Sequence, residues 1–66
     1  MEEIVLQLKM LRIRQHISIA EVARRIGTDR ARMSEIENGR GGLTLKRLYL
    51  WANALGYNVN IKFIEK

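Results

Sequence analysis

The stretch 18–39, SIAEVARRIGTDRARMSEIENG, constrains the fold more than any other part of this sequence. Ser18, followed by Glu21 three residues later, predicts a capping box: the serine hydroxyl accepts a hydrogen bond from the Glu21 amide while the carboxylate reaches back. Gly27 predicts the end of this first helix, because glycine enters the left-handed conformation without steric cost. The apolar face at helical spacing consists of Ile19, Val22, Ala23 and Ile26.

A second short helix follows at once, over roughly residues 29–38. Thr28 is its expected N-cap, and Met33 and Ile36 are its expected inward residues. The turn between the two helices is short and contains a glycine. Two short helices joined in this way form a helix-turn-helix pattern.

This ordered set of caps, small residues and apolar positions resembles the phage-repressor and Cro-like (XRE-type) helix-turn-helix DNA-binding family. The resemblance runs from about residue 8 to residue 56, and it implies an all-α, four-helix, lambda-repressor-like domain. The family usually carries a glutamine that contacts DNA phosphate where this chain has Ile19. The segments that carry the resemblance are 20–23, 26–28 and 33–39.

The composition of the chain limits its possible functions. Sixty-six residues predict a single domain over residues 1–66. There is no cysteine and one histidine, so we expect no disulfide, no metal site and no cofactor. No apolar run approaches the ~20 residues of a membrane helix and no signal peptide is visible, which favours a cytoplasmic protein without membrane contact. Twelve Lys and Arg against seven Asp and Glu give a net charge of +5, which favours a polyanionic partner.

Two further helices are predicted on either side of the pair, over residues 2–15 and 44–55. The core stripe of the first consists of Ile4, Val5, Leu8 and Leu11. Its other large apolar residues are Leu6, Met10 and Ile13. Either these three are partly exposed and available to a second subunit, or the first helix is well buried all round. The later helix has Thr44 as its N-cap, carries Trp51 on its apolar face, and ends at Gly56.

Residues 57–64 change to a period of two, which is typical of a half-buried strand. The apolar positions are Tyr57, Val59, Ile61 and Phe63. One strand cannot pair its own backbone groups, so we expect two copies to pair antiparallel about a two-fold axis as a homodimer. Val59, Ile61 and Phe63 would then be buried against helix 44–55. The alternative is a strand that lies on its own core without pairing.

By resemblance, the second helix of the pair enters the major groove of double-stranded DNA. The residues at base-reading positions are Arg30, Ala31, Arg32 and Glu35. Those expected at phosphates are Ser18, Ile19, Ser34, Asn38 and Arg40. A plain solvated face explains Arg24, Arg25 and Arg47 as well as DNA contact does. The family also pairs an arginine with a glutamate at the positions of Arg12 and Glu37, linking the first helix to the end of the reading helix.

The leading hypothesis is a sequence-specific transcriptional regulator, a repressor that binds a palindromic operator as a homodimer. A narrower alternative is an antitoxin that binds both its own promoter and a toxin protein, because the last helix and strand resemble that branch. A third is a protein-interaction module without DNA binding, for which Ile19 and the acidic Asp29 and Glu35 leave room. No carboxylate pair or nucleophile–base set is evident, so we expect no enzyme and assign no catalytic residue.

Overall fold

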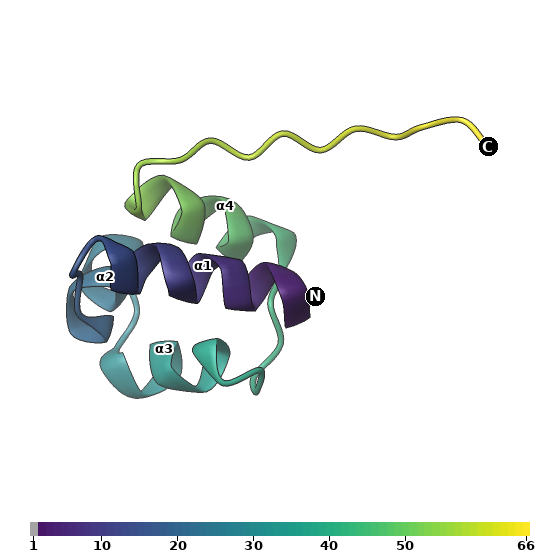
Figure 1. Cartoon of the computed structure of the whole chain (residues 1–66). Helices are drawn as coiled ribbons and strands as arrows, with labels where there is room; N and C mark the ends of the chain where they lie inside the picture. The colour runs from purple at the N-terminus through teal and green to yellow at the C-terminus, as the bar shows by residue number, and fades with distance from the viewer. Residues whose placement is uncertain (1) are drawn as a thin grey trace.

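The computed structural model describes residues 2–66, with side chains from Glu3 onward. Within these residues the chain forms four α-helices and no β-strand (Figure 1). The all-α, four-helix prediction is therefore confirmed over the described residues. The helices are α1 (Glu2–Arg14), α2 (Ile19–Ile26), α3 (Arg30–Glu37) and α4 (Leu45–Ala54).

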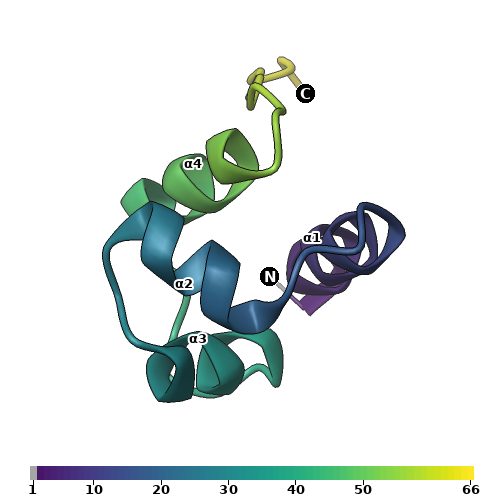
Figure 2. The same ribbon diagram turned by 90° about the vertical axis from the view of Figure 1, so that its left-hand side faces the viewer.

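Helix α2 lies at the centre of the arrangement (Figure 2). It packs against α3 and against α4, while α1 packs against α3. The largest fully buried side chains come from the three later helices: Val22, Met33, Ile36 and Trp51. Each such side chain contributes ~1.5–3 kcal/mol on burial, so this cluster fixes how α2, α3 and α4 cross. From α1, Val5 and Leu8 complete the core.

Helix α2 begins and ends where the sequence predicts, with one difference. The Ser18 hydroxyl accepts a 3.0 Å hydrogen bond from the Glu21 amide, and Gly27 ends the helix with a φ of +81°. The Glu21 carboxylate, however, binds Arg24 and Arg25, so only half of the predicted capping box forms. Charge-assisted bonds to two guanidinium groups are stronger than one bond to a neutral amide.

Helix α3 begins one residue later than predicted. Its N-cap is Asp29, whose carboxylate accepts a 2.7 Å hydrogen bond from the Arg32 amide. Thr28 belongs instead to the end of α2, because its amide donates to the Ala23 carbonyl at 2.9 Å. Aspartate is also the stronger N-cap of the two residues. The prediction that Thr28 caps α3 was therefore wrong.

An ion pair joins the C-terminal part of α1 to the end of α3. Arg12 donates from Nε and Nη2 to the two carboxylate oxygens of Glu37, at 2.6 and 3.0 Å. Its Nη1 donates to the Ile17 carbonyl at 2.7 Å. The side chains of Arg12 and Glu37 are only 11% and 2% exposed. Arg12 therefore holds α1, the connection to α2, and α3 in one place.

The turn after α1 contains a non-glycine residue in the left-handed conformation. His16 has a φ of +59°, and its amide donates to the Ile13 carbonyl while the Ile17 amide donates to the Arg12 carbonyl. The later helices are followed by glycine at the equivalent place, at Gly27, Gly39 and Gly56. A side chain in this conformation costs ~1–2 kcal/mol, so the end of α1 carries backbone strain.

The outer side of α1 is exposed in the single chain. Leu6, Met10 and Ile13 are 59%, 50% and 47% exposed, which excludes a first helix that is buried all round within one chain. We define these three residues as the outer α1 stripe. Ile4, predicted in the core, lies at its edge and is partly exposed.

The predicted strand at 57–64 does not form within one chain. The segment is extended and runs back along α4 before leaving the body of the molecule (Figure 1). No neighbouring strand is present among residues 2–66 to pair with it, which is the physical reason for the difference. Val59 is half-buried and packs against the core, whereas Phe63 is 98% exposed. In the single chain Phe63 is therefore not buried against α4, and its predicted burial in a homodimer stays a prediction.

We expect Glu37→Ala to destabilise the protein by ~3–5 kcal/mol, because it leaves the Arg12 guanidinium buried without its carboxylate. Whole domains unfold with ~5–15 kcal/mol, so much of the stability would be lost. Urea denaturation followed by circular dichroism measures the change. The matched control is Glu35→Ala, an exposed glutamate of the same helix. An unchanged unfolding midpoint for Glu37→Ala would contradict a structural role for the pair.

His16→Gly should stabilise the protein by about 0.5–1 kcal/mol, since glycine relieves the left-handed strain but loses more backbone entropy on folding. For a domain of this size the melting temperature would rise by roughly 2–8 °C. The reverse change at a matching helix end, Gly56→His, should lower the melting temperature. Thermal unfolding of both variants tests whether the melting temperature rises for His16→Gly and falls for Gly56→His. A lower melting temperature for His16→Gly would show that the imidazole makes a stabilising contact.

Candidate nucleic-acid interface

Helix α3 buries one side and exposes the other. Met33, Ile36 and Glu37 face the core. The exposed residues include all four predicted base-reading positions: Arg30, Ala31, Arg32 and Glu35. An eight-residue helix makes little more than two turns, so one exposed face and one buried face account for all of it. The exposed face is free within the chain to meet another molecule.

The two arginines of α3 lie on opposite flanks of its exposed face. Successive residues of an α-helix turn by about 100°, so Arg30 and Arg32 diverge by roughly 200°. Ala31 and Glu35 fall between them, on the line that points away from the core. The small alanine leaves room for a close approach at the middle of the face. Arginine on each flank and a carboxylate near the centre give this surface a defined polar pattern.

The start of α2 offers backbone amides rather than side chains. It lies beside α3 (Figure 2). Ser18 is exposed, but its hydroxyl already accepts from the Glu21 amide. Ile19 is half-buried, and its side chain packs on the core. The amides of Ile19 and Ala20 stand in the first turn, where N–H groups have no partner within the helix. Such amides suit a phosphate oxygen.

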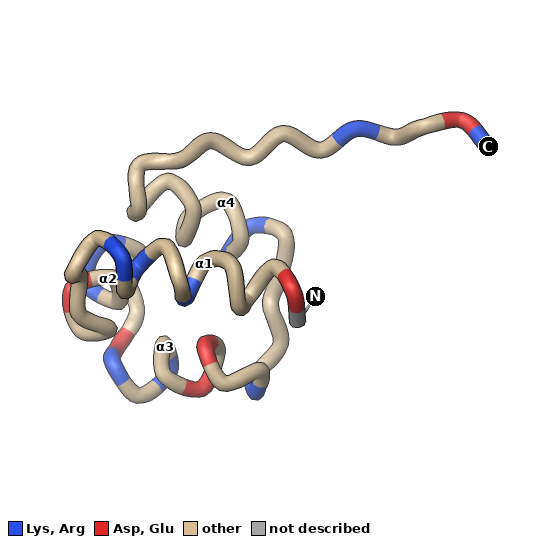
Figure 3. Tube along the Cα trace, viewed as in Figure 1, with Lys and Arg blue, Asp and Glu red and all other residues tan. Residues whose placement is uncertain are grey.

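The last turns of α3 and the loop after it carry the other predicted phosphate contacts. Asn38 and Arg40, which follow the helix, are exposed, while Ser34, within α3, is half-buried. The Arg40 amide donates to the Glu35 carbonyl at 2.8 Å, which closes the end of α3. Figure 3 shows basic positions near the start of α3 and in the loop beyond it, with acidic positions between. Positive charge therefore brackets the exposed face at both ends.

Two arginines of α2 have roles inside the molecule that the sequence did not predict. Arg25 donates to the Glu21 carboxylate at 2.9 Å and to the Ala54 carbonyl, at the end of α4, at 2.8 Å. Arg24 pairs with the same carboxylate. Gln15 likewise donates to the Leu55 carbonyl at 2.8 Å. The i, i+3 and i, i+4 spacings could have indicated the pairs with Glu21, but no sequence signal links residue 25 to residue 54.

Helices α2 and α3 cross at a short turn that contains Gly27, and α3 exposes arginines beside the N-terminus of α2. This arrangement defines a helix-turn-helix protein. The family model described as "Helix-turn-helix" matches residues 8–61. The chain therefore belongs to the XRE-type helix-turn-helix family of Cro- and repressor-like DNA-binding regulators. Neither the curated proteins nor the solved structures gave a match. Over residues 2–66, none of the helices is long and apolar enough to cross a membrane.

The Glu21 cluster predicts a pH dependence of stability. Hydrogen bonds from Arg24 and then Arg25 lower the pKa of the Glu21 carboxyl from 4.5 to about 2. A carboxyl whose pKa is lower in the folded state contributes stability above its unfolded pKa and loses it as the pH falls through the folded value. The melting temperature of Glu21→Gln should therefore be below that of wild type at pH 6.

The difference between Glu21→Gln and wild type should shrink as the pH falls from about 4.5 to about 2, where both proteins lack the charge. Thermal unfolding at several pH values measures it. Because the three side chains are partly exposed, high salt at pH 6 should shrink the same difference by screening. A difference that is constant over this pH range would contradict the pairing.

Proposed function

We propose that this protein is a repressor that binds a palindromic duplex operator as a homodimer, with α3 in the major groove. The observation that carries the proposal is the exposed face of α3, where arginines flank a small central residue. A helix fits the major groove, where each base pair has its own pattern of donors and acceptors. Occupancy of the operator is sufficient for repression, so the proposal needs no catalytic step.

The two arginines are proposed to have different tasks. Arg30 lies in the first turn of α3, the part of a reading helix that reaches base edges, and can bind guanine O6 and N7 together. Arg32 lies on the opposite flank, and we assign it to a phosphate. Glu35, on the central line, can accept a hydrogen bond from cytosine N4. The amides at the start of α2 and the side chains of Asn38 and Arg40 then hold the neighbouring phosphates.

A two-fold dimer presents two reading helices on one side of the duplex. Each helix then needs a major groove facing the same way, so we expect half-sites about 10 base pairs, or ~34 Å, apart. The dimer is proposed to form through the extended segment 57–64, because its apolar residues Ile61, Phe63 and Ile64 are exposed in one chain. The two half-sites would be inverted repeats.

An antitoxin role is the second candidate, and the outer α1 stripe favours it. A groove of about 320 Å³ runs beside this stripe and is lined by Leu6, Gln7, Met10, Leu11 and Arg14. An exposed apolar stripe is a common feature of surfaces that bind another protein. A toxin protein bound there would leave α3 free for the promoter. Affinity capture from cells that carry the neighbouring genes distinguishes the candidates, since a plain repressor would capture no stoichiometric partner.

Arg30→Ala and Arg32→Ala should separate base reading from phosphate binding. The operator is first selected from a random DNA pool, and each variant is then titrated against it and against a scrambled duplex at two salt concentrations. We expect Arg30→Ala to cost ~1–3 kcal/mol per half-site and to relax specificity at one base pair. Arg32→Ala should weaken both duplexes alike and reduce the salt dependence.

The matched control for these titrations is Arg14→Ala, which removes the same charge from the exposed end of α1. It should bind the operator nearly as wild type does. Circular dichroism of each variant checks the fold. Wild-type affinity of both folded α3 variants would mean that α3 does not read the DNA, and would favour a protein-interaction module.

A further inference from the structure

The segment after α4 is anchored at one residue and then leaves its backbone free. The Tyr57 amide donates to the Ala52 carbonyl at 2.9 Å, after Gly56 has turned the chain. Within the described chain, no hydrogen bond involves a backbone group of residues 58–66. An extended segment with free N–H and C=O groups is a template for a second strand. We call residues 57–64 the tail segment.

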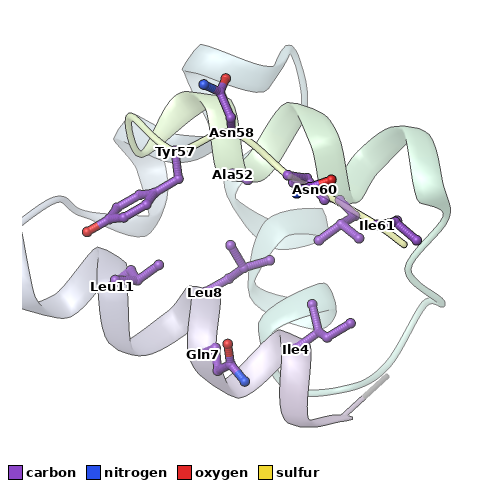
Figure 4. Close-up of a pocket in the computed structure, with 11 residues that line it drawn as sticks. Ile4, Gln7, Leu8, Leu11, Ala52, Tyr57, Asn58, Asn60 and Ile61 are labelled. Atoms are coloured by element: carbon purple, nitrogen blue, oxygen red, sulfur yellow. The ribbon is translucent and has the colours of Figure 1, made fainter. Parts of the chain in front are cut away.

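The tail segment has apolar residues at alternate positions, and its first half borders a groove in its own body. The groove has a volume of about 310 Å³ and lies between the tail segment, α1 and α4. In Figure 4, Leu8 and Leu11 of α1 point toward the tail segment, and the Tyr57 ring lies over Leu11. Val59 and Ile61 line the same groove, and so do Asn58 and Asn60, with the Asn58 side chain directed away from α1. In the sequence, the odd positions of the tail segment are apolar and the even positions up to Lys62 are polar.

Symmetry restricts how two tail segments can pair. A two-fold axis that relates two antiparallel strands of one sheet is perpendicular to that sheet, so equivalent residues of both copies lie on the same face. Residues directly opposite each other also lie on one face, and faces alternate along a strand. Opposite residues must then both be odd or both be even. The axis therefore passes between two copies of the same residue. The identity of that residue defines the register of the two strands.

The apolar pattern distinguishes between the possible axis positions. With the axis at Lys62, the two lysines would lie directly opposite, which like charges disfavour. With the axis at Ile61, Tyr57 would face an acidic residue, Glu65 of the partner subunit. With the axis at Val59, Phe63 would extend past the turn at Gly56 and find no strand opposite it.

With the axis at Asn60, every apolar residue at an odd position of the tail segment faces another one. Tyr57 lies opposite Phe63 of the partner subunit, and Val59 lies opposite Ile61 of the partner subunit. On the other face Lys62 meets an asparagine, Asn58 of the partner subunit. Aromatic pairs and pairs of apolar side chains at opposite positions are the contacts that stabilise such ribbons.

We propose that a second copy of this chain is the occupant of the free edge of the tail segment, in the one register that places the two-fold axis between the two copies of Asn60. This inference rests on the proposed homodimer and gives it a defined geometry. Phe63, which is 98% exposed in one chain, is covered in the dimer by Tyr57 of the partner subunit. The odd-numbered apolar residues of both strands then form one continuous face of the two-stranded ribbon.

Single cysteines in the otherwise cysteine-free chain test the register directly. Residues opposite each other have Cα atoms about 4.5–5.5 Å apart, within reach of a disulfide. Asn60→Cys should therefore cross-link to a covalent dimer under mild oxidation. Asn58→Cys and Lys62→Cys are the matched controls: in the proposed register each would lie about 13 Å along the ribbon from its own copy and should stay monomeric on a denaturing gel.

The double variant Asn58→Cys/Lys62→Cys supplies a second test, because position 58 faces position 62 of the other copy. It should cross-link although neither single variant does. Preferential cross-linking of a control single variant would place the axis elsewhere and overturn the register. If sedimentation equilibrium shows a dimer but none of the cysteine variants cross-links, the tail interface is overturned. That result would point to the outer α1 stripe as the interface.

Sedimentation equilibrium of the unmodified chain tests the homodimer itself. A monomer at all concentrations would overturn the dimer and its register together, and the titrations of the α3 variants would still decide DNA reading separately. Phe63→Ala should raise the dimer dissociation constant at least about a hundredfold, because the contact occurs twice. Lys62→Ala, its neighbour on the polar face, should leave the dissociation constant within about threefold. Equal effects of the two changes would also overturn the register.

Discussion

The bidentate pair between Arg12 and Glu37 is the interaction on which the position of α3 depends. An eight-residue helix is too short to be stable alone, so α3 is held by what it touches. Met33 and Ile36 anchor it to the core and set how it crosses α2 and α4. The ion pair adds a directional restraint, because a guanidinium and a carboxylate accept only a narrow geometry. Its third bond, to Ile17, ties the start of α2 to the same point.

The basic side chains fall into two groups, those with partners inside the fold and those exposed on and beside α3. Arg12 is buried and Arg25 is engaged by Glu21 and by the end of α4, so neither is available to a ligand. Arg30, Arg32 and Arg40 are exposed around the outward face of α3. Net positive charge alone could not have separated these two groups. The division follows from which arginines have a carboxylate or a helix end within reach inside the fold.

Much of the fold was predictable because its signals are local. Ser18, Gly27 and Thr44 mark helix boundaries through contacts with residues three or four positions away, and a sequence displays such spacings. The exposed face of α3 could be predicted for the same reason. The Asp29 cap was missed because two good caps stand side by side. The bonds from Gln15 and Arg25 to α4 depend on the tertiary fold, and the tail segment depends on a second chain.

The bonds from Gln15 and Arg25 to the last carbonyls of α4 have a mechanical consequence. They join the end of α4, where the tail segment begins, to α2 and to the turn between α1 and α2. The same elements hold α3 in place. Any dimer joined through that tail would therefore transmit its geometry to the reading helices through a stiff frame rather than a loose hinge. The distance between two reading helices becomes a property of the monomer's own side chains. Loosening that frame would broaden the range of operator spacings tolerated while leaving each half-site contact intact.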